Sequence, residues 1–172
     1  MGVKLPGILP IQTLEWKQLE GKKIGVDASN TLYQFLSSIR QADGTPLKDS
    51  KGRITSHLSG IFYRSLNLMQ KGIQLAYIFD GKPPDLKLKT QLARRERKEK
   101  AHEKYKQAQD EEDIESMHKY AKQVTYLNNE LIQESKELIK ALGLPVIQSP
   151  QESDAQGSFM VEQNDLWAFA SS

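Results

Sequence analysis

Acidic side chains follow three of the apolar runs in this sequence. Asp27 ends the run that starts at Lys23, Asp80 ends residues 75–80, and Glu152 and Asp154 follow a shorter run at residues 145–147. If these runs are parallel strands, their carboxyl ends meet at one edge of a sheet, where such folds place their sites. Converging carboxylates repel one another, and Mg²⁺, which prefers carboxylate and water oxygens, would relieve that repulsion. Two such ions could activate water and hold the attacking and leaving oxygens of a phosphodiester.

The first two acids also have structural interpretations. Asp27 could be the N-cap of the following helix, with Ser29 and Asn30 as rival caps. Asp80 precedes Gly81 and could be a turn residue. Their place on the same side of one sheet as the third acidic segment favours metal binding.

The third acidic segment resembles a helix start. Residues 149–152 fit a capping box in which Ser149 is the N-cap, Pro150 the first helical residue and Glu152 the third. Capping would explain Glu152 as well as metal binding does, and Asp154 could simply favour the first helical turn.

The elements that must position these acids alternate along the chain. Continuous apolar runs predict strands buried on both faces at residues 23–27, 75–80, 145–147 and 166–170. Helical periodicity occupies residues 30–39, 56–70 and 130–142, and a further helix is expected from about residue 149 through Met160. This order predicts an α/β fold with a central, mainly parallel sheet and helices on both faces. Residues 44–52 are typical of a polar turn region.

A basic segment follows Asp80. Residues 83–122 are too long for an ordinary connection, and residues 93–106 carry many charges and almost no apolar stripe. A helix would place Lys87 and Arg94, seven residues apart, on one face, where two cations could stabilise charge on a phosphate. The alternative is a solvated helix with Glu/Lys pairs. We expect residues 93–116 to be mobile.

Composition limits the function classes. The 172 residues suit one domain, with 38% hydrophobic and 27% charged residues and a net charge of +2. The absence of cysteine excludes disulfides and thiolate metal sites. The most apolar stretch, residues 73–79, is far shorter than a membrane span. Pro6 replaces the Ser or Thr that a myristoylation site needs. We expect an intracellular protein that is not secreted: cytoplasmic in a prokaryote, or nuclear in a eukaryote.

Several motifs resemble one family over essentially the whole chain. They are residues 1–3 (MGV), 26–30 (VDASN) with 33–36 (YQFL), 55–58 (TSHL) with 62–64 (FYR), 79–84 (FDGKPP) with 86–87 (LK), and 142–145 (LGLP) leading to 152–156 (ESDAQ). The FDGKPP run and the PxExxAQ-like run, at this separation, are highly specific. The sequence resembles the N-terminal part of archaeal-type flap endonucleases, of the structure-specific 5′-nuclease superfamily.

The resemblance implies a PIN-like 5′-nuclease fold and metal-dependent cleavage of 5′-flap DNA, with 5′–3′ exonuclease activity, in replication and repair. It implies a two-metal mechanism with two Mg²⁺ per site, Mn²⁺ being possible, and a helical arch at about residues 83–122. By position it assigns roles to residues of three kinds: metal ligands Asp27, Asp80, Glu152 and Asp154; basic catalytic residues Lys87 and Arg94; and DNA contacts Tyr33, Arg40, Thr55, Arg64 and Arg95. Tyr33 would stack near the scissile junction, although such a tyrosine on a helix often packs half-buried instead.

Two departures from the family pattern bear on activity. The family usually has Glu where Asp154 stands, so this shorter acid could bind a metal through water. The family continues after the fourth strand with another acidic pair, a duplex-gripping region and a C-terminal sliding-clamp peptide. The chain stops at Ser172, so we expect residues 1–172 to be an incomplete, C-terminally truncated nuclease domain.

Two other functions remain. A truncated chain could bind DNA weakly without turnover. A small-molecule phosphotransferase with an aspartyl nucleophile is the third class, but the sequence after Asp27 lacks the second acid at +2 and there is no Gly-rich phosphate loop.

Overall fold

The computed structural model describes residues 12–42, 44–83 and 127–171, and scattered residues between these last two ranges: 96, 100, 101, 103–105, 107, 108, 110, 111, 113, 116 and 120. Its centre is a four-stranded parallel sheet in the order β3-β2-β1-β4. The strands are β1 (Lys23–Asp27), β2 (Gln74–Phe79), β3 (Val146–Gln148) and β4 (Ala168–Ala170). The predicted parallel α/β fold is confirmed.

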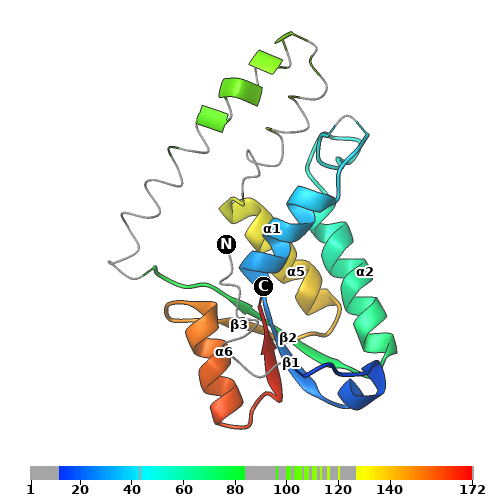
Figure 1. Cartoon of the computed structure of the whole chain (residues 1–172), viewed down its shortest axis with the longest axis vertical. Helices are drawn as coiled ribbons and strands as arrows, with labels where there is room; N and C mark the ends of the chain where they lie inside the picture. Colours follow the sequence, from blue (N-terminus) through cyan, green and yellow to red (C-terminus); the bar gives the residue numbers. More distant parts are fainter. Residues whose placement is uncertain are drawn as a thin grey trace.

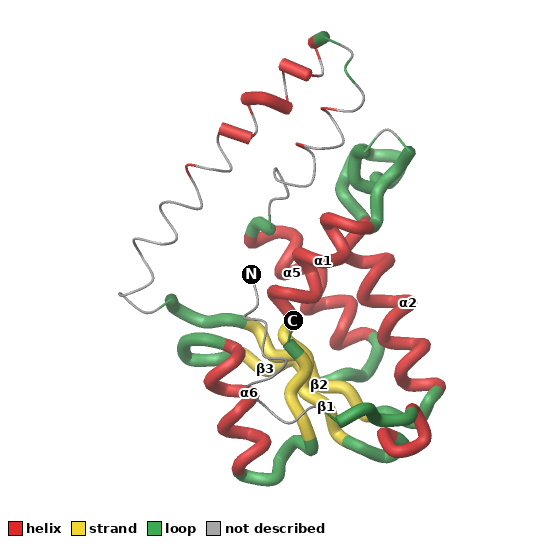
Figure 2. Tube along the Cα trace, viewed as in Figure 1, coloured by secondary structure: helices red, strands yellow, loops and turns green. Residues whose placement is uncertain are grey.

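Helices cover both faces of the sheet, as predicted (Figure 1). One face carries α1 (Ala28–Ser38), α2 (Ser56–Gln70) and α5 (Asn129–Ala141), and the other carries α6 (Ser153–Glu162). A 3₁₀ helix, η1 (Trp16–Leu19), precedes β1 and had no counterpart in the sequence-based prediction. Figure 2 shows the strands between these two helical layers.

Strand β2 supplies both layers of the core because its side chains alternate between the faces. Leu75, Tyr77 and Phe79 pack with the α1, α2 and α5 side. Ala76 and Ile78 belong to the smaller core beneath α6. Burial on both faces explains why the β2 sequence is a continuous apolar run.

Strand β4 is shorter than the predicted run at residues 166–170. Trp167, just before β4, donates its backbone N–H to the carbonyl of Lys23 at 2.8 Å, but the ladder of paired residues begins at Ala168. Leu166 is buried in the smaller core. The apolar character of residues 166–170 therefore reflects core packing before the strand as well as the strand itself.

The loop between α1 and α2 is a short antiparallel excursion. Two isolated bridges join Arg40 to Pro46 and Lys48 to Ile54. The guanidinium of Arg40 closes part of this loop, since its Nε and Nη1 donate to the carbonyls of Ser37 and Gly44 at 3.2 and 2.7 Å. The polar turn expected at residues 44–52 lies within this excursion.

Helices α2 and α5 meet around a buried histidine. The side chain of His57 is fully buried, and its Nε2 lies 3.2 Å from Oε2 of Glu134. Burial lowers the pKa of His57 from its ordinary 6.5, and the Glu134 carboxylate partly offsets that change. His57 is therefore a neutral member of the core at neutral pH.

In the described part of the chain, the helices are all too short or too polar to cross a bilayer.

Candidate functional site

Asp27 lies where β1 becomes α1. It is the last residue of β1 and the N-cap of α1, and its Oδ1 accepts a 3.0 Å hydrogen bond from the backbone N–H of Asn30. Its Oδ2 accepts a 2.9 Å bond from the hydroxyl of Ser171, directly after β4. The capping interpretation of Asp27 is thus confirmed, and it explains why α1 begins at Ala28 and not at Asn30.

Asp80 follows β2 and reaches a helix from elsewhere in the chain. Its Oδ1 accepts a 2.9 Å hydrogen bond from the backbone N–H of Ser153, the first residue of α6. Orphan N–H groups of a first helical turn usually find a partner close by in sequence. Here the partner comes from the neighbouring strand, so β2 and α6 present their acids together.

The predicted capping box at residues 149–152 is wrong. Helix α6 begins at Ser153, its N-cap is Glu152, and the Glu152 side chain makes no capping hydrogen bond. The hydroxyl of Ser149 is buried without a hydrogen-bond partner in the described structure. The backbone of residues 149–151 instead pairs with the end of β2 and the segment after it, and these tertiary bonds displace the helix start that Pro150 suggests.

The acids at this edge act on one another electrostatically. Asp27 is 7% exposed, and its burial raises the pKa of its carboxyl group. The hydrogen bonds from Asn30 and Ser171 counteract that rise, whereas the negative charges of Asp80 and Asp154 add to it. Three of the four predicted metal ligands therefore share one electrostatic environment; Glu152 stands beside Asp154 at the start of α6.

The donor set suits a hard divalent cation, because carboxylate oxygens are the ligands that Mg²⁺ prefers. The repulsion from Asp80 and Asp154, which adds to the effect of burial on the pKa of Asp27, is the interaction a cation would relieve. Within the described ranges, however, no three His, Cys, Asp or Glu side chains are grouped closely enough to hold a metal ion. The residues fit the ion by chemistry and by shared edge, without forming a closed coordination cage.

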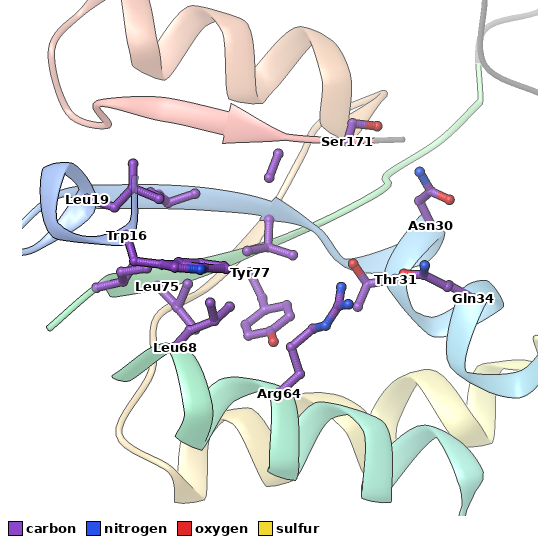
Figure 3. A pocket seen from close by; sticks show the side chains of 14 residues that line it. Trp16, Leu19, Asn30, Thr31, Gln34, Arg64, Leu68, Leu75, Tyr77 and Ser171 are labelled. Atoms are coloured by element: carbon purple, nitrogen blue, oxygen red, sulfur yellow. The ribbon is translucent and has the colours of Figure 1, made fainter. Parts of the chain in front are cut away.

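A pocket of about 330 Å³ adjoins Asp27. Figure 3 shows Trp16, Leu19 and Leu68 at one end of it, and Asn30 and Ser171, both hydrogen-bonded to Asp27, at the other. The lining is apolar at the η1 end and polar beside α1 and Ser171.

The predicted DNA contacts on described residues lie around α1 and α2. Tyr33 is 39% exposed on α1. Arg64 extends from α2 toward Thr31 and Gln34 of α1 (Figure 3), and its guanidinium lies 5.6 Å from the centre of the Phe35 ring. Thr55 is the N-cap residue of α2 without a side-chain capping bond.

The other predicted contacts divide into two groups. Arg40 is half-buried, and two of its nitrogens already serve the loop before α2. Lys87, Arg94 and Arg95 lie outside the described residues. So does most of the predicted arch and mobile segment at residues 83–122, in which the described residues between 96 and 110 are helical.

Sequence reasoning missed the residues that hold the acids. Ser171, Ser153 and Gln148 contact Asp27 or Asp80 through single hydrogen bonds. Their types are common at strand and helix ends, so only the folded arrangement distinguishes them. The one sequence signal nearby is Gly81, whose lack of a side chain suits a close approach of the backbone at residues 149 and 150.

Known proteins resemble this chain in sequence and in structure. Residues 1–101 match the XPG N-terminal domain. Flap endonuclease 1 of Pyrococcus furiosus is 50% identical over 171 residues, which cover 99% of this chain and 50% of that protein. The flap endonuclease 1 of Pyrococcus abyssi is 51% identical over 171 residues, which again cover 99% of this chain and 50% of that protein. The chain thus spans about half the length of these curated relatives.

Solved structures also resemble this chain. The flap endonuclease-1 of Methanococcus jannaschii superimposes with a TM-score of 0.70 at 43% identity, covering 98% of this chain and 53% of that one. The catalytic core of Rad2 in complex with a DNA substrate superimposes with a TM-score of 0.63 at 28% identity, covering 92% of this chain and 39% of that one. The sheet and the helices that cover it therefore have the fold of these structures.

Proposed function

Since the chain belongs to the XPG N-terminal domain family and is similar to the N-terminal portion of archaeal flap endonucleases, we propose that it is the N-terminal part of a structure-specific 5′-flap DNA endonuclease of replication and repair, with 5′–3′ exonuclease activity. Asp27, Asp80 and Asp154 interact at the carboxyl edge of a parallel sheet, and this observation carries the proposal. Helical residues between 96 and 110 are consistent with an arch-like insertion at residues 83–122 within the domain.

The proposed site would bind divalent cations, Mg²⁺ by preference and Mn²⁺ as a substitute. Asp27, Asp80, Glu152 and Asp154 are the residues that would hold them, two ions to a site. When bound, the ions would supply an activated water and neutralise charge on the scissile phosphate.

The chain's own residues prepare the acidic edge for this role. Asn30 and Ser171 fix the orientation of the Asp27 carboxylate through one hydrogen bond to each oxygen. Ser153 does the same for one oxygen of Asp80. Burial of Asp27 excludes water from that carboxylate and strengthens its interaction with any cation.

Further residues would contact the nucleic acid. Lys87 and Arg94 would stabilise charge on the scissile phosphate, with Arg95 beside them. Tyr33 is exposed on α1 and would stack on a base of the DNA. Such stacking does not depend on the sequence, because every base has a flat aromatic face. Arg64 and Thr55 would contact the phosphate backbone from the α2 side, with Arg40 in the adjacent loop. A sliding-clamp contact would belong to a C-terminal segment of a longer protein.

A second candidate is DNA binding without turnover. Two observations favour it for the 172-residue chain: the chain spans about half of its curated relatives, and the described acids do not form a closed metal site. Missing ligands would lower metal affinity, and affinity for DNA would then rest on the basic residues alone.

One experiment separates the two candidates. The chain is incubated with a 5′-labelled flap duplex and Mg²⁺, with and without a chelator, and binding is followed by fluorescence anisotropy. Asp80→Asn tests the acidic edge, and Asp165→Asn is the matched control, since Asp165 lies before β4 at the opposite edge of the sheet. The nuclease is supported if the chain cleaves the flap, a chelator stops this cleavage, Asp80→Asn abolishes it, and Asp165→Asn leaves it unchanged. Binding without cleavage supports the second candidate for this chain.

A further inference from the structure

The segment after β2 runs alongside the segment after β3. Ser149 donates its backbone N–H to the carbonyl of Phe79 at 2.9 Å. Beyond it, the N–H groups of Gly81 and Lys82 donate to the carbonyls of Gln151 and Pro150. These bonds join the two acidic loops into one unit that carries Asp80 on one side and Glu152 on the other.

Gly81 allows this close approach. A Cβ atom at position 81 would overlap the carbonyl oxygen of Ser149 and lie 2.6 Å from that of Pro150. Both neighbours are backbone atoms, which cannot rotate away as a flexible side chain can. The unit therefore depends on the missing side chain.

A glutamine side chain reinforces the same junction. Gln148 is the last residue of β3, opposite Phe79 in the register. Its Nε2 donates to the backbone carbonyl of Asp80 at 2.6 Å. Its Oε1 accepts a 2.7 Å hydrogen bond from Nζ of Lys136 on α5, and the same ammonium lies 5.0 Å from the centre of the Phe79 ring.

These contacts determine how the amide is oriented. Lysine can only donate, so the amide oxygen must face Lys136 and the amide nitrogen must face the carbonyl of Asp80. The side chain thus connects α5 to the residue whose carboxylate caps α6. Both ends of Asp80 are then held: its carbonyl by Gln148 and its carboxylate by Ser153.

We propose that Gln148 is a positioning residue that holds Asp80 in place for cation binding at the acidic edge. The inference rests on the proposed function, in which Asp80 is a metal ligand. Metal affinity depends on how well the ligands are held, and loss of an outer hydrogen-bond partner commonly lowers it by about 10–100-fold. Gln148 acts through Asp80 and touches no cation itself.

The test replaces Gln148 with methionine, which has a similar length and no hydrogen-bonding amide. Mn²⁺ affinity of the 172-residue chain is measured by the loss of the free-ion electron paramagnetic resonance signal, and the exchange rate of the Ser153 amide by NMR. We expect Gln148→Met to weaken Mn²⁺ binding about tenfold and to speed exchange at Ser153. Gln163→Met, at the far end of α6, is the control and should change neither.

Contrary outcomes have distinct meanings. Unchanged Mn²⁺ affinity in Gln148→Met, even with a lower melting temperature, overturns the positioning role, because a merely structural residue would change stability alone. Absence of Mn²⁺ binding by the wild type instead favours the second candidate, DNA binding without turnover, for this chain. The exchange rate at Ser153 then still decides whether Gln148 holds Asp80. If Gln148→Met fails to fold, Gln148→Glu replaces it in the exchange measurement. This variant keeps an acceptor for Lys136 but has no N–H to donate to the carbonyl of Asp80. Exchange at Ser153 as slow as in the wild type would then overturn the proposal.

Discussion

The carboxylate of Asp80, just after β2, accepts a 2.9 Å hydrogen bond from the backbone N–H of Ser153, the first residue of α6. These residues are 73 positions apart, so the cap of α6 comes from a different part of the chain. One side chain therefore both stabilises a helix start and belongs to the acidic edge.

The two roles of Asp80 should separate by substitution. Asp80→Ala removes both the cap and the charge, and should lower the free energy of unfolding by about 1 kcal/mol, the usual cost of losing an N-cap acceptor. Asp80→Asn keeps an acceptor oxygen and should retain near wild-type stability, while both variants lose Mn²⁺ affinity. Urea denaturation and Mn²⁺ titration check this. Equal stability of wild type and Asp80→Ala would show that the hydrogen bond does not stabilise α6.

Asp27→Asn should stabilise the fold and weaken the site. The folded-state pKa of Asp27 is raised, so its contribution to stability is greatest at low pH and declines as the pH rises through that pKa. An asparagine caps a helix as well as aspartate does, and it removes a buried negative charge and, with it, the smaller repulsion from Asp80 and Asp154. We expect a gain of about 0.5–2 kcal/mol at pH 7 in urea denaturation, in the range of single stabilising substitutions.

Magnesium provides the complementary measurement for Asp27. An ion that binds only the folded state raises stability, by about 2.7 kcal/mol at a hundred times its Kd. Mg²⁺ should therefore raise the melting temperature of the wild type and leave that of Asp27→Asn unchanged. An equal Mg²⁺-dependent rise in both proteins would remove Asp27 from the cation site.

Gly81→Ala should disturb the acidic edge directly. The added methyl group would overlap backbone carbonyl oxygens of residues 149 and 150, at a cost of about 1–3 kcal/mol for overpacking. Gly143→Ala is the matched control: that glycine has a φ of 76°, and a methyl group there would meet no other atom within 4 Å, so the variant loses stability through backbone strain alone. Thermal unfolding should show both losses, whereas Mn²⁺ affinity should fall only in Gly81→Ala. Retained Mn²⁺ affinity in Gly81→Ala would mean that the two loops tolerate separation.

His57 should make the fold sensitive to mild acid. Its pKa in the folded state lies below the 6.5 of the unfolded chain, so the unfolded chain binds the extra proton first as the pH falls. The stability contributed by the neutral imidazole is complete above about pH 6.5 and is lost as the pH drops toward the folded-state pKa. His57→Gln, which cannot titrate, should lose less unfolding free energy than the wild type between about pH 7.5 and 5.5, the range that brackets the histidine titration. Equal losses in urea denaturation would exclude His57 as a source of the acid sensitivity.

Much of the sheet could be predicted because its strands are buried on both faces. The run ending in Asp27 became β1 with the predicted bounds, and α2 begins at Ser56 and ends at Gln70 as its periodicity indicates. The acids at the ends of β1 and β2 follow from a general property of parallel sheets. Their common edge was thus predictable before any contact was known.

The start of α6 could not be predicted, because local and tertiary signals disagree there. Ser149 and Pro150 have the composition of a helix start, but their backbone is held by Phe79, the last residue of β2, and by Lys82 in the loop after it. Such bonds join segments far apart in the chain and leave no periodic trace in either one. The same holds for Gln148, whose partners Lys136 and Asp80 come from two different elements.

Helices α1 and α6 both begin at the edge that carries the acids. Each helix start bears a partial positive charge of about half a unit from its aligned peptide dipoles. The acidic edge thus has a permanent counter-charge built from main chain, which offsets part of the repulsion among Asp27, Asp80 and Asp154. The acidic edge can therefore fold before a cation binds, in contrast to small domains that remain unfolded until their metal binds.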